Sequence, residues 1–467
     1  MHSPIKALTK IGSNPRKEAH IMKQAISFDD IALFREKFES DRTNKVAMNA
    51  CTKNGLKKAA ASVQASADNL HAFSVTVESG EVTDQKSSGR CWMFASLNVM
   101  RLEVMKKLNI KNMELSQNYT LFYDKLEKSN YFLENIIATL GEPLNGRVIS
   151  FLLGDLLGDG GQWDMFRALV AKYGVVPQDV MPETENSSKT GDMNKYLKTK
   201  LREFACTLRS KAADGASIDD LRTLKDDMLE TIYRILSISL GEPPQRFTWE
   251  TYDKDDKFIR IAGITPQEFY KEYIGMDLDR FVTVINAPTA DKPFGRTYTV
   301  RLLGNVCGGK YPVKYLNLPI DDLKALTIAQ LKDGKIVWFG SDVGQFSDYE
   351  RGFLTMDALD ISGIYGTDFP MTKAERLDYG ESLMTHAMAI TGVDLDENGK
   401  PTRWKVENSW GKEGGKDGYF IMSDEWFDEF TYQILLDEKY FSTEQKAQFD
   451  TDPIELEPWD PMGSLAL

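Results

Sequence analysis

The stretch QKSSGRCWMF, residues 85–94, places one cysteine between a short polar run and an apolar one. Cys91 stands where a helix is predicted to begin, because residues 91–108 have apolar side chains at helical spacing and basic ones at the C-terminal end. The free N–H groups at a helix start favour a thiolate. A cysteine buried at the start of a core helix is the alternative. The stretch alone leaves both interpretations open.

The composition describes an ordinary globular protein. The chain has 467 residues, of which 42% are hydrophobic and 27% charged, enough for a large core and more than one substructure. No apolar run approaches the roughly 18–20 residues of a membrane-spanning helix. The net charge of −13 disfavours a nucleic-acid partner, because such binding depends on lysine and arginine contacts with phosphate.

The N-terminal segment, MHSPIKALTKIGSNPRK (1–17), is basic and lacks the continuous apolar core of a secretory signal. It contains no acidic residue, so a targeting segment stays open beside a flexible extension, and Met22 is an alternative start. The four cysteines show no paired spacing and no cluster with histidine. We therefore expect a reducing, cytoplasmic compartment, no zinc site and no cofactor.

Hydrophobic patterning predicts both helices and strands. Apolar residues at helical spacing predict helices over 28–65 and over much of 115–235, where the glycine-rich LLGDGGQW (156–163) is a break. Strands are predicted where apolar residues alternate or run together, at 73–77, 281–288, 334–343, 386–395 and 402–410.

The last two predicted strands flank DENGK (396–400), a turn with its glycine. An antiparallel hairpin centred on Glu397 pairs Ile390 with Trp404 and His386 with Asn408. The side chains of the second pair would then lie within about 5 Å of each other at Cβ.

A reactive cysteine needs a base or an imidazolium beside it. Of the four histidines, His2 and His20 fall in the N-terminal extension, and His71 has no evident partner. His386 is the histidine with a predicted polar neighbour, Asn408. We therefore expect His386 to be the catalytic base.

Three cysteines compete with Cys91 for the role of nucleophile. Cys51 and Cys206 lie in helical patterns and are predicted to belong to helix cores. Cys307 is the rival, because the glycines of NVCGGKYP (305–312) could expose it. It has no helix behind it, so Cys91 remains the preferred candidate.

Three separate segments resemble papain-like cysteine peptidases. QKSSGRCWMFASLN (85–98) is similar to their active-site segment, THAMAITGV (385–393) to their histidine strand and VENSWG (406–411) to their asparagine segment. The order Cys, His, Asn also matches.

The number of residues between Cys91 and His386 restricts the resemblance to a smaller group of these peptidases. His386 follows Cys91 by about 295 residues, whereas papain-type enzymes separate the two by about 130–150. The implied insertion of roughly 150 residues, the long N-terminal arm, GQWDM (161–165) and the ending EPWDPMGSLA (457–466) resemble the bleomycin hydrolase/aminopeptidase C family, above all its bacterial-type members.

That resemblance implies an α+β fold: a papain-like, two-lobed cysteine peptidase with a large, mostly helical insertion, an N-terminal arm and a C-terminal tail that enters the cleft. The implied segments are an extension and helical arm (1–65), a helical lobe with Cys91 (66–175), the insertion (176–340), a β lobe with His386 and Asn408 (341–450) and the tail (451–467). It also implies a homohexamer, peptide substrates with a free N-terminus and no membrane partner.

The resemblance also assigns roles in the site. Cys91 is the nucleophile, held as a thiolate beside the imidazolium of His386. Asn408 orients the imidazole ring, and Trp410 shields that contact. Gln85 donates from its side-chain amide to the oxyanion, together with the backbone N–H of Cys91.

The tail is expected to make the enzyme an aminopeptidase, because its terminal carboxylate pairs with the α-ammonium group of the substrate. The chain ends Leu465-Ala466-Leu467. If Ala466 is the residue that carries this carboxylate, Leu467 protrudes by one residue, and we expect the enzyme to remove it. The alternatives are an endopeptidase of the same fold, a nucleic-acid-binding relative and an inactive relative.

Overall fold

A computed structural model describes residues 25–65, 69–154 and 156–464. These residues form two compact units, which are described separately: residues 25–61 with 360–368, and residues 62–359 with 369–464. Each residue of the predicted site that the structure describes belongs to the larger unit.

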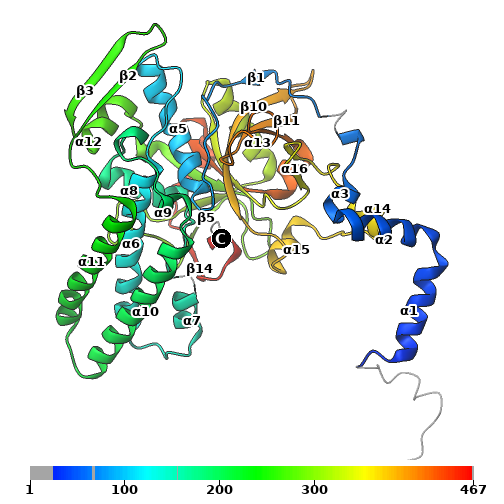
Figure 1. Cartoon of the computed structure of the whole chain (residues 1–467), viewed down its shortest axis with the longest axis horizontal. Helices are drawn as coiled ribbons and strands as arrows, with labels where there is room; N and C mark the ends of the chain where they lie inside the picture. Colours follow the sequence, from blue (N-terminus) through cyan, green and yellow to red (C-terminus); the bar gives the residue numbers. More distant parts are fainter. Residues whose placement is uncertain (1–24, 66–68, 155, 465–467) are drawn as a thin grey trace, which may run out of the picture. The chain divides into compact units, whose positions relative to one another are not determined.

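The smaller unit is helical, as the sequence predicts for residues 28–60 (Figure 1). Its elements are α1 (Phe28–Ser40), α2 (Arg42–Asn54), α3 (Leu56–Ala60) and α14 (Ile361–Tyr365). The side chains of Ser27 and Asp41 cap the first two helices. Gly55 follows α2 at a φ of 83°, a conformation that favours glycine and separates α2 from α3. Helices α1 and α2 bury none of their residues.

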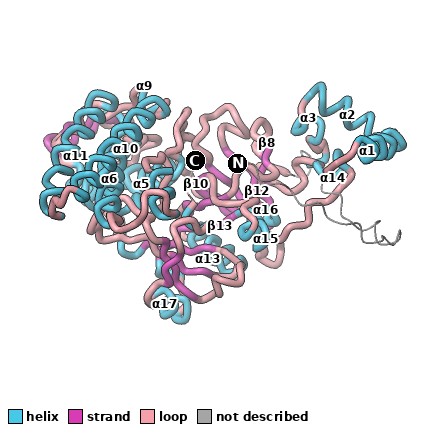
Figure 2. Tube along the Cα trace, turned by 90° about the horizontal axis from the view of Figure 1, so that it is seen from below, coloured by secondary structure: helices cyan, strands magenta, loops and turns pink. Residues whose placement is uncertain are grey.

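In the larger unit, long helices gather on one side of a sheet. Helices α6, α10 and α11 lie side by side in both views (Figures 1 and 2). The main helices are α5 (Cys91–Lys107), α6 (Gln117–Ala138), α7 (Arg147–Gly154), α8 (Trp163–Tyr173), α10 (Gly191–Ala213), α11 (Ile218–Leu240) and α13 (Ile320–Lys332). The glycine-rich break predicted at 156–163 lies between α7 and α8.

Short helices complete this unit. They are η2 (Gln178–Val180), α9 (Glu185–Ser188), α12 (Pro266–Phe269), η3 (Tyr270–Ile274), η4 (Leu278–Arg280), α15 (Lys373–Asp378), α16 (Asp424–Phe430), η5 (Glu438–Tyr440), α17 (Thr443–Phe449) and η6 (Pro461–Gly463). Among the described residues, no helix combines the length and the apolar character that crossing a membrane requires.

Within the described residues, twelve strands form one mixed sheet in the order β14-β5-β6-β4-β13-β7-β10-β11-β12-β9-β8, with β1 beside β10. The pairs β14–β5, β4–β6 and β9–β12 are parallel, and the others are antiparallel. The strands are β1 (Val75–Thr76), β4 (Phe281–Ile285), β5 (Arg296–Val300), β6 (Tyr315–Asn317), β7 (Val337–Ser341), β8 (Ser347–Asp348), β9 (Phe353–Leu354), β10 (His386–Leu395), β11 (Pro401–Glu407), β12 (Tyr419–Ser423), β13 (Thr431–Asp437) and β14 (Ile454–Leu456).

The sheet crosses the boundary predicted at residues 340 and 341. Strands β4, β5 and β6 come from the segment predicted to be a mostly helical insertion, yet they join the sheet that contains β7 and β10. Strand β4 is buried along its whole length, so it needs this sheet as its partner. Within the segment, α10 and α11 are followed by a separate hairpin of β2 (Phe247–Tyr252) and β3 (Phe258–Ile264). The short helices α12, η3 and η4, the strands β4–β6 and the helix α13 come after the hairpin.

Helix α5 is buried between the sheet and the other helices. It contacts β10 and β7 on one side and α6 and α8 on the other, and its residues from Cys91 to Arg101 are all buried. A helix surrounded on all sides needs apolar residues around its whole circumference, which explains the tryptophan, methionine and phenylalanine that follow Cys91. The indole of Trp338 on β7 donates to the Trp92 carbonyl at 3.3 Å.

The predicted hairpin of β10 and β11 forms, but its predicted register is wrong. Ile390 pairs with Val406 rather than with Trp404. His386 lies opposite Ser341 of β7 and has no ladder partner on β11 among the described residues. The predicted contact between the histidine and the asparagine therefore cannot come from cross-strand pairing.

The turn explains the shift in register. Asp396 Oδ1 accepts hydrogen bonds from the N–H groups of Asn398 and Lys400, and the Asp396 N–H donates to the Lys400 carbonyl. The turn is thus centred on Asn398 instead of Glu397, which moves every pair along the ladder. Two irregularities, between Asp394 and Leu395 and between Ile390 and Gly392, shift the register further along the ladder.

Candidate active site

Four of the residues singled out from the sequence line one cleft of about 880 Å³. Cys91 and Gln85 come from the helical side, and His386 comes from the start of β10. Trp410 follows β11 and is the fourth. The remaining lining residues are 86–89, Gly158, Asp159, Thr190, Gly191, Asn194, Lys198, 342–344 and Thr385.

Cys91 is the first residue of α5 and is 1% exposed. Arg90, at the N-cap position, makes no side-chain capping bond, so the helix start faces the thiol without a competing side-chain oxygen. Cys91 Sγ accepts a hydrogen bond from the N–H of Ala387 at 3.4 Å. Since Ala387 directly follows His386, this bond holds the sulfur beside the start of β10.

The contact between His386 and Asn408 fixes which ring nitrogen carries hydrogen. His386 Nε2 lies 2.8 Å from Asn408 Oδ1. The same oxygen accepts the backbone N–H of Ser409 at 2.8 Å, which identifies it as the amide oxygen. Nε2 must therefore be the donor, and Nδ1 of the neutral ring is the nitrogen with a free lone pair.

Burial disfavours separate charges on the two groups. It raises the pKa of the Cys91 thiol to about 11, against the opposing effect of backbone hydrogen bonds. It lowers the pKa of His386 to about 4, although the bond to Asn408 acts in the opposite direction. These shifts work against the resting thiolate that the sequence predicts. A proton that leaves Sγ therefore needs an acceptor inside the site, and the free lone pair of His386 offers one.

Gln85 is 6% exposed and its side chain is held at both ends. Its Nε2 donates to the Ser88 carbonyl at 2.6 Å, and its Oε1 accepts from the Ser409 hydroxyl at 2.6 Å. The backbone N–H of Gln85 also donates to the Ser409 carbonyl at 2.8 Å. An amide nitrogen carries two hydrogens, so one remains for a ligand in the cleft.

Trp410 packs against the histidine. The two ring centroids are 4.7 Å apart at an interplanar angle of 31°, and Trp410 also contacts Tyr349 and Phe420. The geometry is that of a packing contact which covers one face of the imidazole.

The other candidate residues lie elsewhere. Cys206 is exposed, so the prediction that it belongs to a helix core is wrong. The buried stripe of α10 passes through Leu201, Phe204 and Leu208, and Cys206 lies on the opposite face. Cys307 is half-buried and is not part of the cleft.

Further residues from the sequence predictions have no place in the cleft. Cys51 is half-buried in α2. His71 packs against Phe73 with ring centroids 6.3 Å apart. Four residues lie outside the described part of the chain: His2, His20, Ala466 and Leu467.

The sequence predictions missed the wall of the cleft next to Cys91. Asp159 accepts hydrogen bonds from Lys125, Thr190, Asn194 and the N–H of Gly89, at 2.5–3.1 Å. Burial alone would raise its pKa, but Lys125 and the other donors hold the pKa well below its usual range. The glycine-rich break marked this segment as a loop, but no local pattern pairs its aspartate with partners 30 residues or more away.

Ser409 was also missed, although it stands inside the quoted VENSWG segment.

Among the described residues, no group of three or more histidine, cysteine or acidic side chains is arranged to hold a metal ion.

Comparisons with known proteins concern the chain as a whole. Residues 25–463 match the model of the Peptidase C1-like family. The chain is 47% identical to aminopeptidase C of Lactobacillus delbrueckii subsp. lactis, over 95% of this chain and 99% of that protein. It is 42% identical to human bleomycin hydrolase, over 94% of this chain and 99% of that protein. The crystal structure of PepW from Lactobacillus rhamnosis HN001 is 49% identical, covers 95% of this chain with all of its own, and superposes with a TM-score of 0.93.

Proposed function

This chain belongs to the peptidase C1-like family, and on that premise we propose that it is a cysteine aminopeptidase that releases the first residue of peptides. Relatives named aminopeptidase C, 45–49% identical over most of the chain, support this activity. The observation that carries the mechanism is the hydrogen bond from His386 Nε2 to Asn408, which leaves Nδ1 as the base in a cleft that also holds Cys91.

In the proposed reaction, Cys91 Sγ attacks the carbonyl carbon of the first peptide bond, and its proton passes to His386 Nδ1. The tetrahedral oxyanion is stabilised by the free hydrogen of Gln85 Nε2 and by the Cys91 N–H. His386 then returns the proton to the leaving amine, and a thioester remains. Water hydrolyses this thioester: His386 takes its proton, hydroxide displaces the sulfur, and the thiol is restored.

The C-terminal arm, residues 457–464, supports the proposal that the tail limits cleavage to free N-termini. Its last described residue is held on both sides: Gln162 Nε2 donates to the Ser464 carbonyl, and the Ser464 hydroxyl donates to the Met384 carbonyl, each at 3.0 Å. Met384 stands two residues before His386. The arm therefore runs towards the segment that carries the proposed base.

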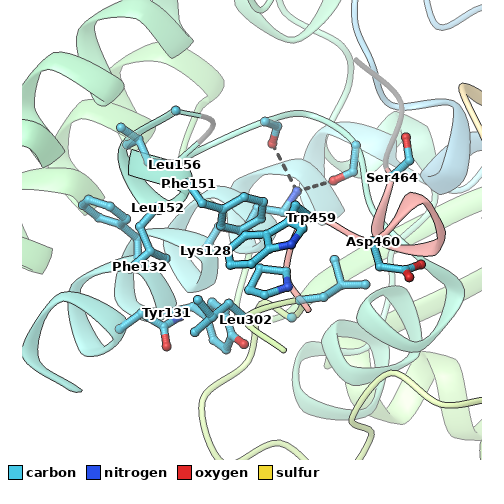
Figure 3. Close-up of a pocket in the computed structure, with 18 of the residues that line it drawn as sticks. Lys128, Tyr131, Phe132, Phe151, Leu152, Leu156, Leu302, Trp459, Asp460 and Ser464 are labelled. Carbon is cyan, nitrogen blue, oxygen red and sulfur yellow. Dashed lines mark hydrogen bonds between the residues drawn. The ribbon is translucent and has the colours of Figure 1, made fainter. Parts of the chain in front are cut away.

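Upstream, the arm is attached by charge and by aromatic packing. Asp460 pairs with the buried Lys292 at 2.9 Å. Trp459 lies beside Phe151 with centroids 6.4 Å apart (Figure 3), and the Arg147 guanidinium lies 3.7 Å from the Trp459 ring centroid. Phe151, Trp459 and Asp460 line a mostly apolar cavity of about 460 Å³, which Gly158 and Gly160 also line. Attachment along the arm suits a segment that must end at a fixed point.

In this proposal the tail carboxylate, on Ala466 once Leu467 is removed, pairs with the α-ammonium group of the substrate. Both residues lie outside the described part of the chain. Intact-mass measurement of the active enzyme and of a Cys91→Ala variant tests the removal. We expect loss of Leu467 in the active enzyme alone, and its retention there would contradict the proposal.

The proposed activity is tested with a free-amine aminoacyl fluorogenic amide and its N-acetylated form. We expect the wild type and a Cys206→Ala control to hydrolyse the free amine but not the acetylated form, and Cys91→Ala to hydrolyse neither. Equal cleavage of both forms by the full-length chain would refute an aminopeptidase and favour an endopeptidase.

The proposal also includes a cytoplasmic location and assembly into a homohexamer. All four cysteines are free, which suits a reducing compartment. Helix α1 exposes five large apolar side chains, which suits a surface for another copy of the chain: Phe28, Ile31, Leu33, Phe34 and Phe38. Light scattering after gel filtration tests the assembly, and a monomeric mass at micromolar concentration would contradict it.

A further inference from the structure

A fully buried ion pair lies in the same core as the proposed site but outside its cleft. Arg101 Nη2 lies 2.9 Å from Glu407 Oε1, and neither side chain has exposed area. Burial raises the pKa of Glu407, and the Arg101 guanidinium opposes that rise. Removing two charges from water is costly, and such a pair often adds little net stability. Its position therefore matters more than its strength.

The two partners stand on the segments that carry the proposed nucleophile and the ring-orienting asparagine. Arg101 is on α5, about three turns along the helix from Cys91. Glu407 is the last residue of β11 and directly precedes Asn408. Strand β11 is itself fixed between β10 and β12, where Glu407 pairs with Ala389 and Tyr419.

Arg101, together with Asn98, also holds the segment that carries Gln85. Arg101 Nη2 donates to the Glu81 carbonyl at 2.8 Å. Asn98, one turn before Arg101 on α5, donates from Nδ2 to Glu407 Oε1 at 2.8 Å and to the Thr83 hydroxyl at 3.1 Å. Glu407 Oε1 thus accepts hydrogen bonds from Asn98 and Arg101, both on α5. The same two residues also donate to the chain two to four residues before Gln85.

We propose that the Arg101–Glu407 pair, together with Asn98, is a positioning element that sets the relative register of Cys91, Asn408 and Gln85. This inference rests on the proposed peptidase function, because it assigns a role to residues that touch none of the reacting atoms. It adds to the cleft a set of positioning residues outside its lining.

Small displacements at this point reach the site directly. Asn408 Oδ1 must meet both His386 Nε2 and the Ser409 N–H, and the Ser409 hydroxyl must meet Gln85. A shift of Glu407 moves the next two residues with it. A misplacement of about 1 Å can cost on the order of 100-fold in rate.

The test compares Glu407→Gln with a matched control, Asp437→Asn. Asp437 is also buried and paired, with Arg280 at 2.8 Å and Lys335 at 3.3 Å. Apart from the sheet ladder, its other hydrogen bonds within the described part of the chain go to Gln330 and Lys439, away from the segments that carry the site. Each variant is titrated for active thiols, and kcat and KM per titrated site are measured on the free-amine aminoacyl amide, with melting temperatures alongside.

We expect Glu407→Gln to lower kcat per titrated site by about 10- to 100-fold with KM changed less than about threefold. Asp437→Asn should lower the melting temperature and leave kcat per site unchanged. A merely structural role would make the two variants alike. Equal kcat per site in Glu407→Gln and Asp437→Asn would overturn the proposal.

Two further variants keep the test decisive if Glu407→Gln does not fold. Asn98→Ala removes the links to Glu407 and Thr83 without burying an unpaired charge, and it should lower kcat per site by about 5-fold or more. The double variant Arg101→Glu with Glu407→Arg keeps an ion pair with its charges reversed. It should recover part of the kcat per site that Glu407→Gln loses. Unchanged kcat in Asn98→Ala would overturn the proposal, whereas a wild type that is inactive on the free amine would instead refute the proposed function.

Discussion

The candidate active-site cleft and the C-terminal arm belong to the same compact unit but are held in different ways. Cys91, His386 and Asn408 are each 5% exposed or less and are fixed by core contacts and short hydrogen bonds. The arm keeps most of its residues partly exposed and depends on a few attachments, at Trp459, Asp460 and Ser464. In the proposed roles, the cleft performs the chemistry and the arm controls access. Because separate contacts hold the two, we expect that each can be altered without the other.

Removal of the nucleophile should abolish the chemistry and leave the arm in place. We expect Cys91→Ala to lower kcat/KM on the free-amine amide by about 10⁴-fold or more. Calorimetry should still detect binding of a peptide with a free N-terminus and weaker binding of its acetylated form. Loss of that binding preference would mean that the cleft and the arm are not independent.

The oxyanion donor should have the next largest effect. Gln85→Ala removes one donor, which is worth about 2.7–4 kcal/mol of transition-state stabilisation, or roughly 10²–10³ in kcat. Ser409→Ala is the matched control, since it removes the partner of Gln85 Oε1 but keeps the donor. A loss in Ser409→Ala as large as in Gln85→Ala would show that the position of the amide, rather than its donor hydrogen, limits the rate.

The buried histidine should leave a signature in stability against pH. The pKa of His386 is about 4 in the folded chain, below its ordinary 6.5. Between these values the unfolded chain binds a proton that the folded chain does not, so stability falls as the pH falls from 6.5 towards 4. From pH 7 to pH 5 this group accounts for about 2 kcal/mol.

Chemical unfolding of the wild type, His386→Gln and His71→Gln at the two pH values measures this contribution. Burial, with Lys416 and Lys405, also lowers the pKa of His71 to about 4, so both variants should lose less stability on acidification than the wild type. Only His386→Gln should lose activity. An unchanged pH slope in His386→Gln would contradict the assigned burial effect.

The smallest expected effect concerns the arm. Gln162→Ala removes the bond to the Ser464 carbonyl and should loosen the end of the arm. We expect the ratio of free-amine to N-acetyl cleavage to fall by about 10-fold, close to the value of one hydrogen bond, with kcat on the free amine nearly unchanged. A fall in kcat without a change in the ratio would place Gln162 with the cleft instead.

Parts of the fold that depend on local pattern were predictable. Helix α5 begins at Cys91 and β10 spans His386–Leu395, as the apolar spacing predicts. In the structure, Gln85, Cys91 and His386 line one cleft, and Asn408 is hydrogen-bonded to His386. The roles of these residues remain predictions.

Features that depend on contacts between distant segments were not predictable. The hairpin register follows from the side chain of Asp396 in its turn, which composition alone does not reveal. Asp159 accepts hydrogen bonds from side chains on α6 and α10. Glu407 accepts one from Arg101, which lies more than 300 residues away in the sequence. Cys206 was predicted to be buried because it lies in a helix with apolar residues. The packing of α10 against its neighbours decides which face is buried, and Cys206 is on the other face.

The role of the arm is tested by the ratio of free-amine to N-acetyl cleavage in the full-length chain and in a chain that ends at Gly463. We expect the full-length enzyme to cleave only the free amine and the shortened enzyme to cleave the acetylated substrate as well, with Cys91 required in both. A shortened enzyme that still rejects the acetylated substrate would contradict the claim that the arm decides which peptides reach the cysteine.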